Sequence, residues 1–286
     1  MNKFCPEYGK SMGKNWSSGL IEHIENYTAY ISVVFSWMMQ DAFQRAIWLK
    51  AQGYRVMAGG PAVSMNPGCI NEVADIEGEW SALSYHNPDA TFTSRGCIRN
   101  CKFCAVPKIE GHLIELTDWE PKPIVCDNNL LACSLKHFDN VIDRLNPIRG
   151  VDFNQGLDAR LLTKHHAERL AELDLYAVRL AWDHIGLENQ YMAAFQILRD
   201  AGIPARKIRT YVLIGYKDTP DDALYRLQTI KDLGSWPNPM RYQPLDAQRK
   251  NEYVGENWTE RELKNYMRYW SRLRWLEHIP FEDYST

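Results

Sequence analysis

Three cysteines, Cys97, Cys101 and Cys104, lie close together in a C-x3-C-x2-C spacing. Iron–sulfur clusters are held by cysteine thiolates, and a cubane [4Fe-4S] cluster normally takes four of them. Three thiolates from one tight loop leave one iron without a protein ligand. An open coordination position is where a protein-bound metal meets its substrate. The spacing therefore predicts a [4Fe-4S] cluster with one reactive iron.

Other uses of these cysteines fit the sequence less well. A structural zinc site takes a fourth Cys or His at short spacing, and the nearest one, His112, comes eight residues after Cys104. A disulfide framework is disfavoured because the chain has seven cysteines and begins with no signal-peptide pattern. A chance group of buried cysteines is the remaining alternative.

The stretch from Thr93 to Cys104, with Phe103 just before the last cysteine, resembles the cluster loop of radical S-adenosylmethionine (SAM) enzymes. In that family the open iron is chelated by the amino and carboxylate groups of SAM. The reduced cluster then cleaves SAM to methionine and a 5′-deoxyadenosyl radical. The resemblance implies an oxygen-sensitive enzyme with an electron donor of the flavodoxin or ferredoxin type. Phe103 would pack beside the cluster and the adenine of SAM, or else fix the loop to the fold.

Composition describes an ordinary globular protein. The 286 residues suffice for one large domain, or one plus a small partner domain. The longest apolar run, residues 31–39, is too short to cross a bilayer. A net charge of −3 gives no global positive field for a nucleic acid. Reduced cysteines without a targeting segment favour the cytoplasm, where an oxygen-sensitive cluster also survives.

Residues 1–88 are expected to form a small α/β (Rossmann-like) segment. The first 28 residues are polar and predicted to be irregular, and a strand (29–35), a helix (39–52) and two strands (54–58 and 74–79) follow. This order, with Gly59-Gly60-Pro61 after the second strand, resembles the back half of the cobalamin-binding domain that precedes the core in many radical SAM enzymes. The front half and an Asp-x-His-x-x-Gly motif are missing. We therefore expect a truncated domain that binds no cobalamin.

Residues 89–247 alternate strand and helix patterns, which favours a parallel sheet with helices outside it. Thr219-Pro220 begins one of the helices and Gly234 ends it. Six such units resemble the partial (βα)6, TIM-like barrel of the radical SAM fold. The expected strands are 90–93, 123–126, 151–154, 177–182, 208–214 and 240–243.

Residues 248–286 form a C-terminal extension with one helix, which starts at Thr259 with a capping box to Glu262. Its apolar stripe comprises Leu263, Tyr266, Met267, Trp270 and Leu273. A second row of side chains, Lys264, Arg268 and Arg272, fits a solvated face. The alternative is contact with a polyanionic substrate, aided by stacking on Trp258, Tyr269 and Trp275. This alternative is the only support for a nucleic-acid or nucleoside substrate, modified for example by methylthiolation or base alkylation.

Ligands of parallel α/β sheets bind at the carboxyl ends of the strands, so these ends supply the candidate SAM ligands. By resemblance, Asp127 and Asn128 after the second strand would bind the SAM amino group, unless they cap the following helix. Arg160 after the third strand would bind the SAM carboxylate or border the substrate. An ion pair with Asp158 or Asp174 is its alternative role.

The remaining strand ends add four candidates. Asn154 is expected to face the nucleoside hydroxyls, and by resemblance Asp183 stands where relatives place the Glu of Gly-x-Glu-Ser, an acid on the SAM ribose or amino group. The sequence departs from that pattern, because Asp183 is one carbon shorter and His184 replaces the Ser. Gly215 permits close approach of the backbone to the adenine. His184 is a candidate proton donor to the substrate, or makes a structural hydrogen bond.

Cys126 directly precedes Asp127 at a strand's carboxyl end. Strand alternation points its thiol either into the pocket, as a hydrogen donor or substrate anchor, or into the helix layer. The other cysteines, Cys5, Cys69 and Cys133, have no ligand spacing and are interpreted as buried or surface thiols.

The sequence thus predicts a radical SAM enzyme that abstracts a hydrogen atom from an unidentified substrate. The rival hypothesis is a non-catalytic iron–sulfur protein that transfers electrons or senses redox state. The two differ in whether the cluster responds to SAM.

Overall fold

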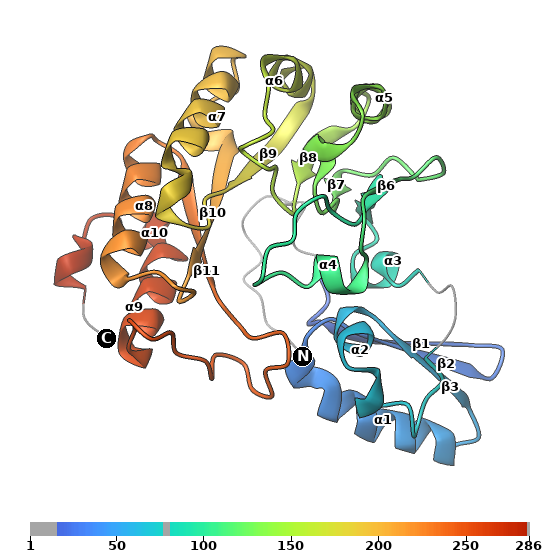
Figure 1. The fold of residues 1–286 in the computed structure, drawn as a ribbon. Helices are drawn as coiled ribbons and strands as arrows, with labels where there is room; N and C mark the ends of the chain where they lie inside the picture. The colour runs from blue at the N-terminus through green and yellow to red at the C-terminus, as the bar shows by residue number, and fades with distance from the viewer. Residues whose placement is uncertain (1–15, 77–80, 285–286) are drawn as a thin grey trace.

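A six-stranded parallel sheet forms the larger part of the computed structural model, which describes residues 16–76 and 81–284. The strands pair in the order in which they occur in the chain (Figure 1). The fold is therefore α/β, as predicted. The strands are β4 (Ala90–Thr91), β7 (Ile124–Val125), β8 (Arg149–Phe153), β9 (Asp174–Ala181), β10 (Ile208–Ile214) and β11 (Trp236–Arg241).

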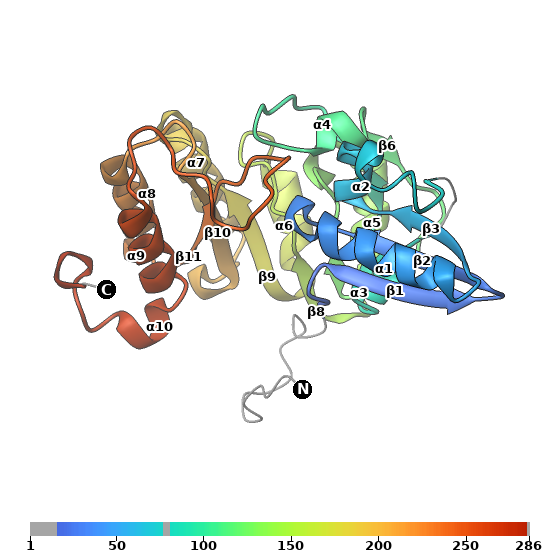
Figure 2. The same cartoon turned by 90° about the horizontal axis from the view of Figure 1, so that it is seen from below.

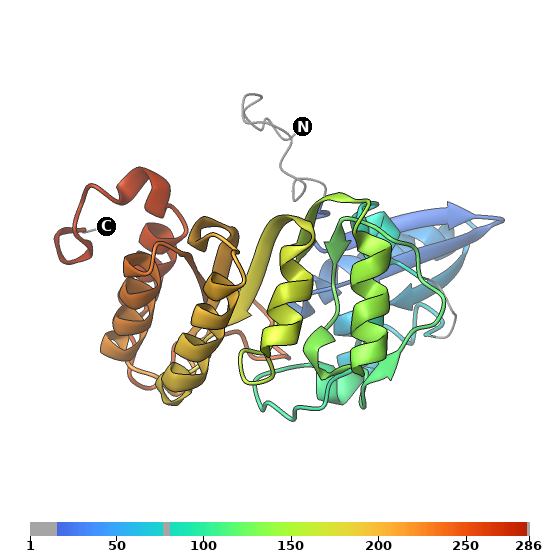
Figure 3. The same cartoon turned by 90° about the horizontal axis from the view of Figure 1, so that it is seen from above.

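Helices cover one face of this sheet, where they stand side by side (Figure 3). They pack on the apolar residues that alternate along the strands, such as Val178 and Leu180 of β9, both fully buried. Thr219 begins α8 by accepting a hydrogen bond from the backbone of Asp222, which confirms the predicted cap. The helices are α5 (Leu135–Leu145), α6 (Lys164–Ala171), α7 (Glu188–Asp200), α8 (Pro220–Asp232) and α9 (Glu260–Trp270).

The other face of the sheet is polar near its middle. Arg179 of β9 donates to the Asp152 carboxylate of β8 (Nε to Oδ1, 2.8 Å) and to the Tyr211 hydroxyl of β10 (2.9 Å). That hydroxyl in turn donates to the backbone carbonyl of Asn154 (2.7 Å). Asp152 is 1% exposed, so its charge depends on this pairing. The network fixes three neighbouring strands relative to one another just below their carboxyl ends.

β4 and β11 are the edges of the sheet, and they do not pair with each other within the described residues. The last strand starts earlier than predicted, at Trp236 instead of Met240. Pro237 and Pro239 made this stretch look like a loop in the sequence. An edge strand pairs on one side only and therefore tolerates proline.

The N-terminal part forms a separate three-stranded sheet in the order β1-β2-β3. The prediction of irregular structure up to residue 28 is wrong, because β1 (Leu20–Glu25) pairs antiparallel with β2 (Thr28–Val33). Asn26 and Tyr27 form the turn with φ values of 46° and 62°, which a two-residue hairpin requires. Because this turn lacks the usual glycine, no sign of a hairpin is present in the sequence here.

The predicted strand–helix–strand unit is confirmed, with α1 (Met39–Ala51) between β2 and β3 (Arg55–Gly59), which run parallel. The strand predicted at residues 74–79 is reduced to one bridge between Met57 and Asp75, and its residues 77–79 lie outside the described chain. This sheet and α1 share a small core of their own. The short helices α2 (Pro61–Met65) and α3 (Leu83–His86) follow.

The N-terminal sheet and α9 lie at opposite ends of the larger sheet (Figures 1 and 2). The segment between β11 and α9 returns across the molecule, and the Ser36 hydroxyl donates to the carbonyl of Ala247 (2.7 Å). A second link is His86 of α3, whose ring nitrogens bond Ser17 (2.6 Å) and Ser32 of β2 (2.9 Å).

The C-terminal helix α9 begins as predicted, with a reciprocal capping box between Thr259 and Glu262. The proposed stacking surface is not available, because Trp258 is 6% and Tyr269 1% exposed, whereas Trp275 is 67% exposed. Lys264 pairs with Glu260 on the solvated side. A short helix, α10 (Leu273–Leu276), follows. None of the helices in the described ranges has the length and apolar character needed to span a membrane.

Candidate metal centre

The cysteine-bearing segment is a loop closed at its base. Strands β5 (Ser94–Arg95) and β6 (Ile114–Glu115) pair antiparallel on its two sides, and α4 (Val106–Ile109) lies within it. Gly96 has a φ of +74°, and a Cβ there would lie 2.0 Å from the carbonyl oxygen of His112. Only glycine allows the two sides to approach so closely. The loop follows β4, so it starts at the carboxyl end of the parallel sheet.

Glu110 ties the loop base to the next strand end. Its carboxylate accepts bonds from the Arg95 guanidinium (3.0 and 2.8 Å), the Gly96 backbone N–H (2.8 Å) and the Asn128 side chain (2.7 Å). Glu110 was not predicted as a site residue, because nothing in the local sequence reveals partners that come together only in the fold. Asn128, predicted to contact SAM, here supports the loop.

Asp127 also differs from its predicted place beside SAM. It is 4% exposed, and its carboxylate accepts bonds from the Thr93 backbone (2.6 Å), the Thr93 hydroxyl and the Ser94 hydroxyl (2.9 Å). Burial raises the pKa of Asp127, although these hydrogen bonds act in the opposite direction. With its oxygens engaged inside the protein, Asp127 holds the start of the cysteine loop against β7.

Cys97, Cys101 and Cys104 are all partly buried free thiols. Burial raises the pKa of Cys101 and of Cys104, and the other cysteines of the loop raise both further. Among the described residues, no group of three or more His, Cys, Asp or Glu side chains converges on a point that could hold one metal ion. The thiolates of a cubane bind different irons, so they surround the cluster instead of converging on one atom.

Arg160 and Asp158 follow β8 and reach the cysteine loop. Asp158 accepts bonds from Arg160 (2.6 and 3.0 Å) and from Arg99 of the loop (2.9 Å). Burial acts to raise the pKa of Asp158, but the two arginines outweigh it and hold the pKa below its usual range. The predicted alternative for Arg160, an ion pair with Asp158, is present. The positive charge of Arg160 also lowers the pKa of Cys101.

Asp183 follows β9 and faces the same place. Its negative charge raises the pKa of both Cys101 and Cys104. Burial raises the pKa of Asp183 itself, against the lowering influence of Arg160. No hydrogen-bond partner for its carboxylate is found within the described part of the chain. Cys101, Cys104, Arg160 and Asp183, which follow three different strands, thus influence one another electrostatically. The Asp158 carboxylate joins Arg160 to Arg99 of the cysteine loop.

Phe103 lies near the end of β10. The Phe103 ring packs edge-on against Tyr216, which follows Gly215, with 5.4 Å between centroids. Gly215 has a φ of +80°, and its backbone N–H donates to Asp218 (2.9 Å). The closest approach at Gly215 is made by the C-terminal segment, since a Cβ there would lie 3.2 Å from Leu263.

Cys126 is 1% exposed and packs with Ala90 and Ile124. Burial raises the pKa of its thiol to about 12. Cys126 lies on the same side of β7 as Ile124, opposite to Val125 of the helix-packed core, so its thiol does not point into the helix layer. Its catalytic role stays a prediction. Of the other candidates, His184 is exposed just before the short helix turn Ile185–Leu187, and Asn154 stands half-buried at the end of β8.

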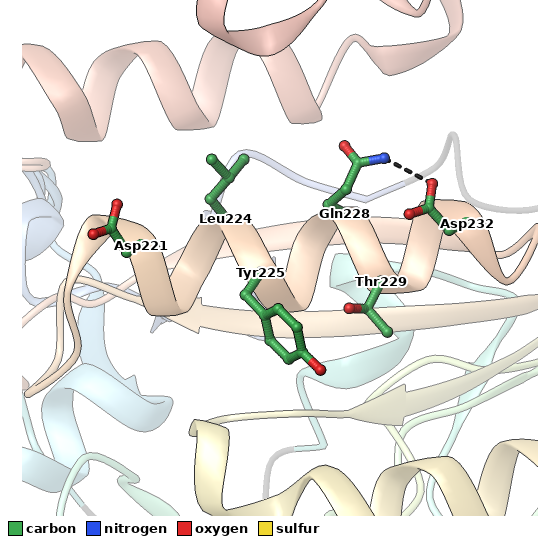
Figure 4. A pocket seen from close by; sticks show the side chains of 6 residues that line it. All are labelled: Asp221, Leu224, Tyr225, Gln228, Thr229 and Asp232. Carbon is green, nitrogen blue, oxygen red and sulfur yellow. Dashed lines mark hydrogen bonds between the residues drawn. The ribbon is translucent and has the colours of Figure 1, made fainter.

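A surface depression lies away from these groups, on the outer side of α8 (Figure 4). Tyr225 and Thr229 project on one side of the helix, and Leu224 and Gln228 on the other. Within the depression, the side-chain amide of Gln228 donates a hydrogen bond to the Asp232 carboxylate (2.7 Å). This depression contains none of the predicted site residues and has no part in the candidate centre.

Fold and site together define an α/β protein that presents three cysteines of one loop at the carboxyl end of a parallel sheet. No protein-family model and no curated protein matches this chain.

Proposed function

We propose that this protein is a radical SAM enzyme, which generates a 5′-deoxyadenosyl radical to abstract a hydrogen atom from its substrate. One observation carries the proposal. Arg160, which follows β8, reaches the cysteine loop through Asp158, whose carboxylate also accepts a hydrogen bond from Arg99 of the loop. The charge of Asp183, which follows β9, acts on Cys101 and Cys104. This arrangement supports a site with thiolates for a cluster and opposite charges for a zwitterion.

The residues fit the two groups that such an enzyme binds. Cys97, Cys101 and Cys104 would hold a [4Fe-4S] cluster, which supplies the electron for reductive cleavage of SAM. Arg160 matches a carboxylate, because its planar fork pairs with both oxygens. Asp183 matches an ammonium or a ribose hydroxyl, since it is a largely buried acceptor without a hydrogen-bond partner in the described residues.

The other candidates take supporting places in this proposal. Phe103 would border the adenine beside Tyr216, and Asn154 and Gly215 stand at the ends of β8 and β10. Asp127 and Asn128 position the loop and do not touch SAM. His184 is exposed at the rim beside Asp183 and is proposed as a proton donor to the substrate.

The proposed architecture is a partial barrel of six strand–helix units, open between β4 and β11. The small N-terminal sheet is proposed as a truncated cobalamin-binding domain that serves a structural purpose. It has three strands, whereas a complete doubly wound sheet has about five or six. The enzyme would work in the cytoplasm with a flavodoxin- or ferredoxin-type electron donor.

The substrate is proposed only as a molecule with an unreactive C–H bond. Burial of Trp258 and Tyr269 removes the stacking surface on which a nucleic-acid or nucleoside substrate depended. Of Trp258, Tyr269 and Trp275, only Trp275 is exposed, and this single ring does not restore such a surface.

Adding SAM to the reduced, anaerobically reconstituted protein tests the proposal. The electron paramagnetic resonance spectrum of the cluster should change, because SAM would coordinate the open iron. A spectrum that stays the same at saturating SAM would instead support the rival hypothesis of a non-catalytic iron–sulfur protein.

A further inference from the structure

Asn129 lies at the end of β7 and contacts the first cysteine of the loop. Its side-chain amide nitrogen is 3.5 Å from Cys97 Sγ and 3.4 Å from an oxygen of Asp158. The residue is 3% exposed and directly precedes the short turn Leu130–Ala132. A buried amide between a sulfur and a carboxylate is held in one position.

The orientation of this amide follows from its surroundings. The Cys97 sulfur and the Asp158 carboxylate are both acceptors, so only the NH2 group can face them. The Asn129 Oδ1 atom on the other side is buried without a partner in the described residues. An unsatisfied buried carbonyl is unfavourable. The N–H contacts therefore set the conformation of the side chain.

Cys97 differs from the other two cysteines in its hydrogen bonds. Its sulfur also accepts a hydrogen bond from the backbone N–H of Arg99 (3.3 Å), so it has two hydrogen-bond donors. In the described chain, Asn129 is the one side chain that donates to any of the three loop sulfurs. Arg99 and Arg160 neutralise Asp158, so this carboxylate does not counteract the amide.

We propose that Asn129 raises the reduction potential of the cluster bound by Cys97, Cys101 and Cys104. This inference rests on the proposed function, because it requires the cluster. Reduction adds negative charge to the cluster and its thiolates, and an N–H donor on a ligand sulfur stabilises that charge. Asn129 thereby makes it easier for the electron donor to reduce the cluster.

A redox titration of the anaerobically reconstituted protein, followed by electron paramagnetic resonance, tests this inference. Asn129→Ala removes the donor, and Asn129→Leu keeps the approximate size and the neutral charge but has no side-chain N–H. Both should retain four irons and require a more negative potential for half-reduction. We expect the ratio of reduced to oxidised cluster at a fixed potential to fall about tenfold, or ~59 mV for one electron. Asn140→Ala, an exposed asparagine of α5, is the matched control and should titrate like the wild type.

The outcomes separate the inference from the function on which it rests. A full cluster whose potential is unchanged in Asn129→Leu would overturn the inference and leave the proposed function intact. If the Ala variant loses its cluster, the titration of the Leu variant decides. A wild-type protein that binds no [4Fe-4S] cluster would overturn both, because no cluster would exist for Asn129 to influence.

Discussion

At the scale of single residues, charge and hydrogen-bond satisfaction distinguish ligand-facing groups from structural ones. Asp127 and Asp183 are both buried acids at strand ends, and burial raises the pKa of each. The carboxylate of Asp127 is occupied by Thr93 and Ser94, whereas Asp183 has no hydrogen-bond donor in the described chain. Asp183 is therefore the acid that remains available to a bound molecule.

Asp183→Asn should weaken SAM binding while leaving the iron content intact. The substitution keeps the size of the side chain but removes the charge. A charge-assisted hydrogen bond is worth about 1.5–3 kcal/mol, so the affinity should fall by roughly one to two decades. Anaerobic equilibrium binding measures it, with Asp232→Asn on the outer side of α8 as the control. Unaltered affinity would move the SAM amino or ribose contact to another strand end.

Gly96→Ala should prevent the loop from closing and abolish cluster retention. An alanine there suffers both the left-handed backbone strain, about 1–2 kcal/mol, and a collision with the His112 carbonyl. Gly53→Ala is the matched control, because Gly53 also has a positive φ but open space around its Cβ position. Iron and sulfide analysis after reconstitution compares the two. Equal cluster content in both variants would show that the tight closure is not needed.

At the scale of elements, the strands that sequence reasoning found are those with unambiguous local patterns. β10 matches its predicted range, Ile208–Ile214. Buried residues alternate with partly exposed ones along the whole strand, and Gly215 follows it. β1 and the start of β11 were missed, since an Asn-Tyr turn and two prolines indicate loops when read locally. Both segments are strands because each pairs with a neighbouring strand, β1 with β2 and β11 with β10. The same holds for the site, where Glu110 and Asn129 gain their partners only through the fold.

His86 of α3 joins its element to the N-terminal sheet and makes stability depend on pH. Burial lowers the pKa of His86, so the folded protein takes up this proton less readily than the unfolded chain. The stabilisation is complete above the ordinary histidine pKa of about 6.5 and declines as the pH falls below it. Denaturant unfolding should therefore show a lower midpoint at about pH 5.5 than at about pH 7.5.

The variant His86→Gln should show a smaller decrease between the same two pH values. Some decrease should remain, because burial also lowers the pKa of His166. An identical decrease in variant and wild type would remove His86 as a source of the pH dependence.

At the scale of the whole molecule, the two sheets have separate cores and meet through a few polar contacts, such as His86 with Ser32 and Ser36 with Ala247. The larger sheet carries the candidate site at its carboxyl edge. The smaller one stands beside the cysteine loop without contributing any predicted ligand. It has three strands, whereas a complete doubly wound sheet has about five or six, and we expect it to give a corrin ring too little support.

Cobalamin should accordingly be lost from the protein during gel filtration. The measurement is the visible absorbance of cobalamin in the protein fraction after incubation with hydroxocobalamin. Stoichiometric retention would contradict the account of a truncated domain and would favour a radical methyltransferase.

The central claim is that the three-cysteine loop drives reductive cleavage of SAM, and the formation of 5′-deoxyadenosine tests it most directly. The anaerobically reconstituted protein, supplied with dithionite and SAM, should release 5′-deoxyadenosine and methionine. Cys101→Ala should release neither, because a site with only three thiolates has none to spare. A wild-type protein that carries a full [4Fe-4S] cluster and yet forms no 5′-deoxyadenosine would contradict the account.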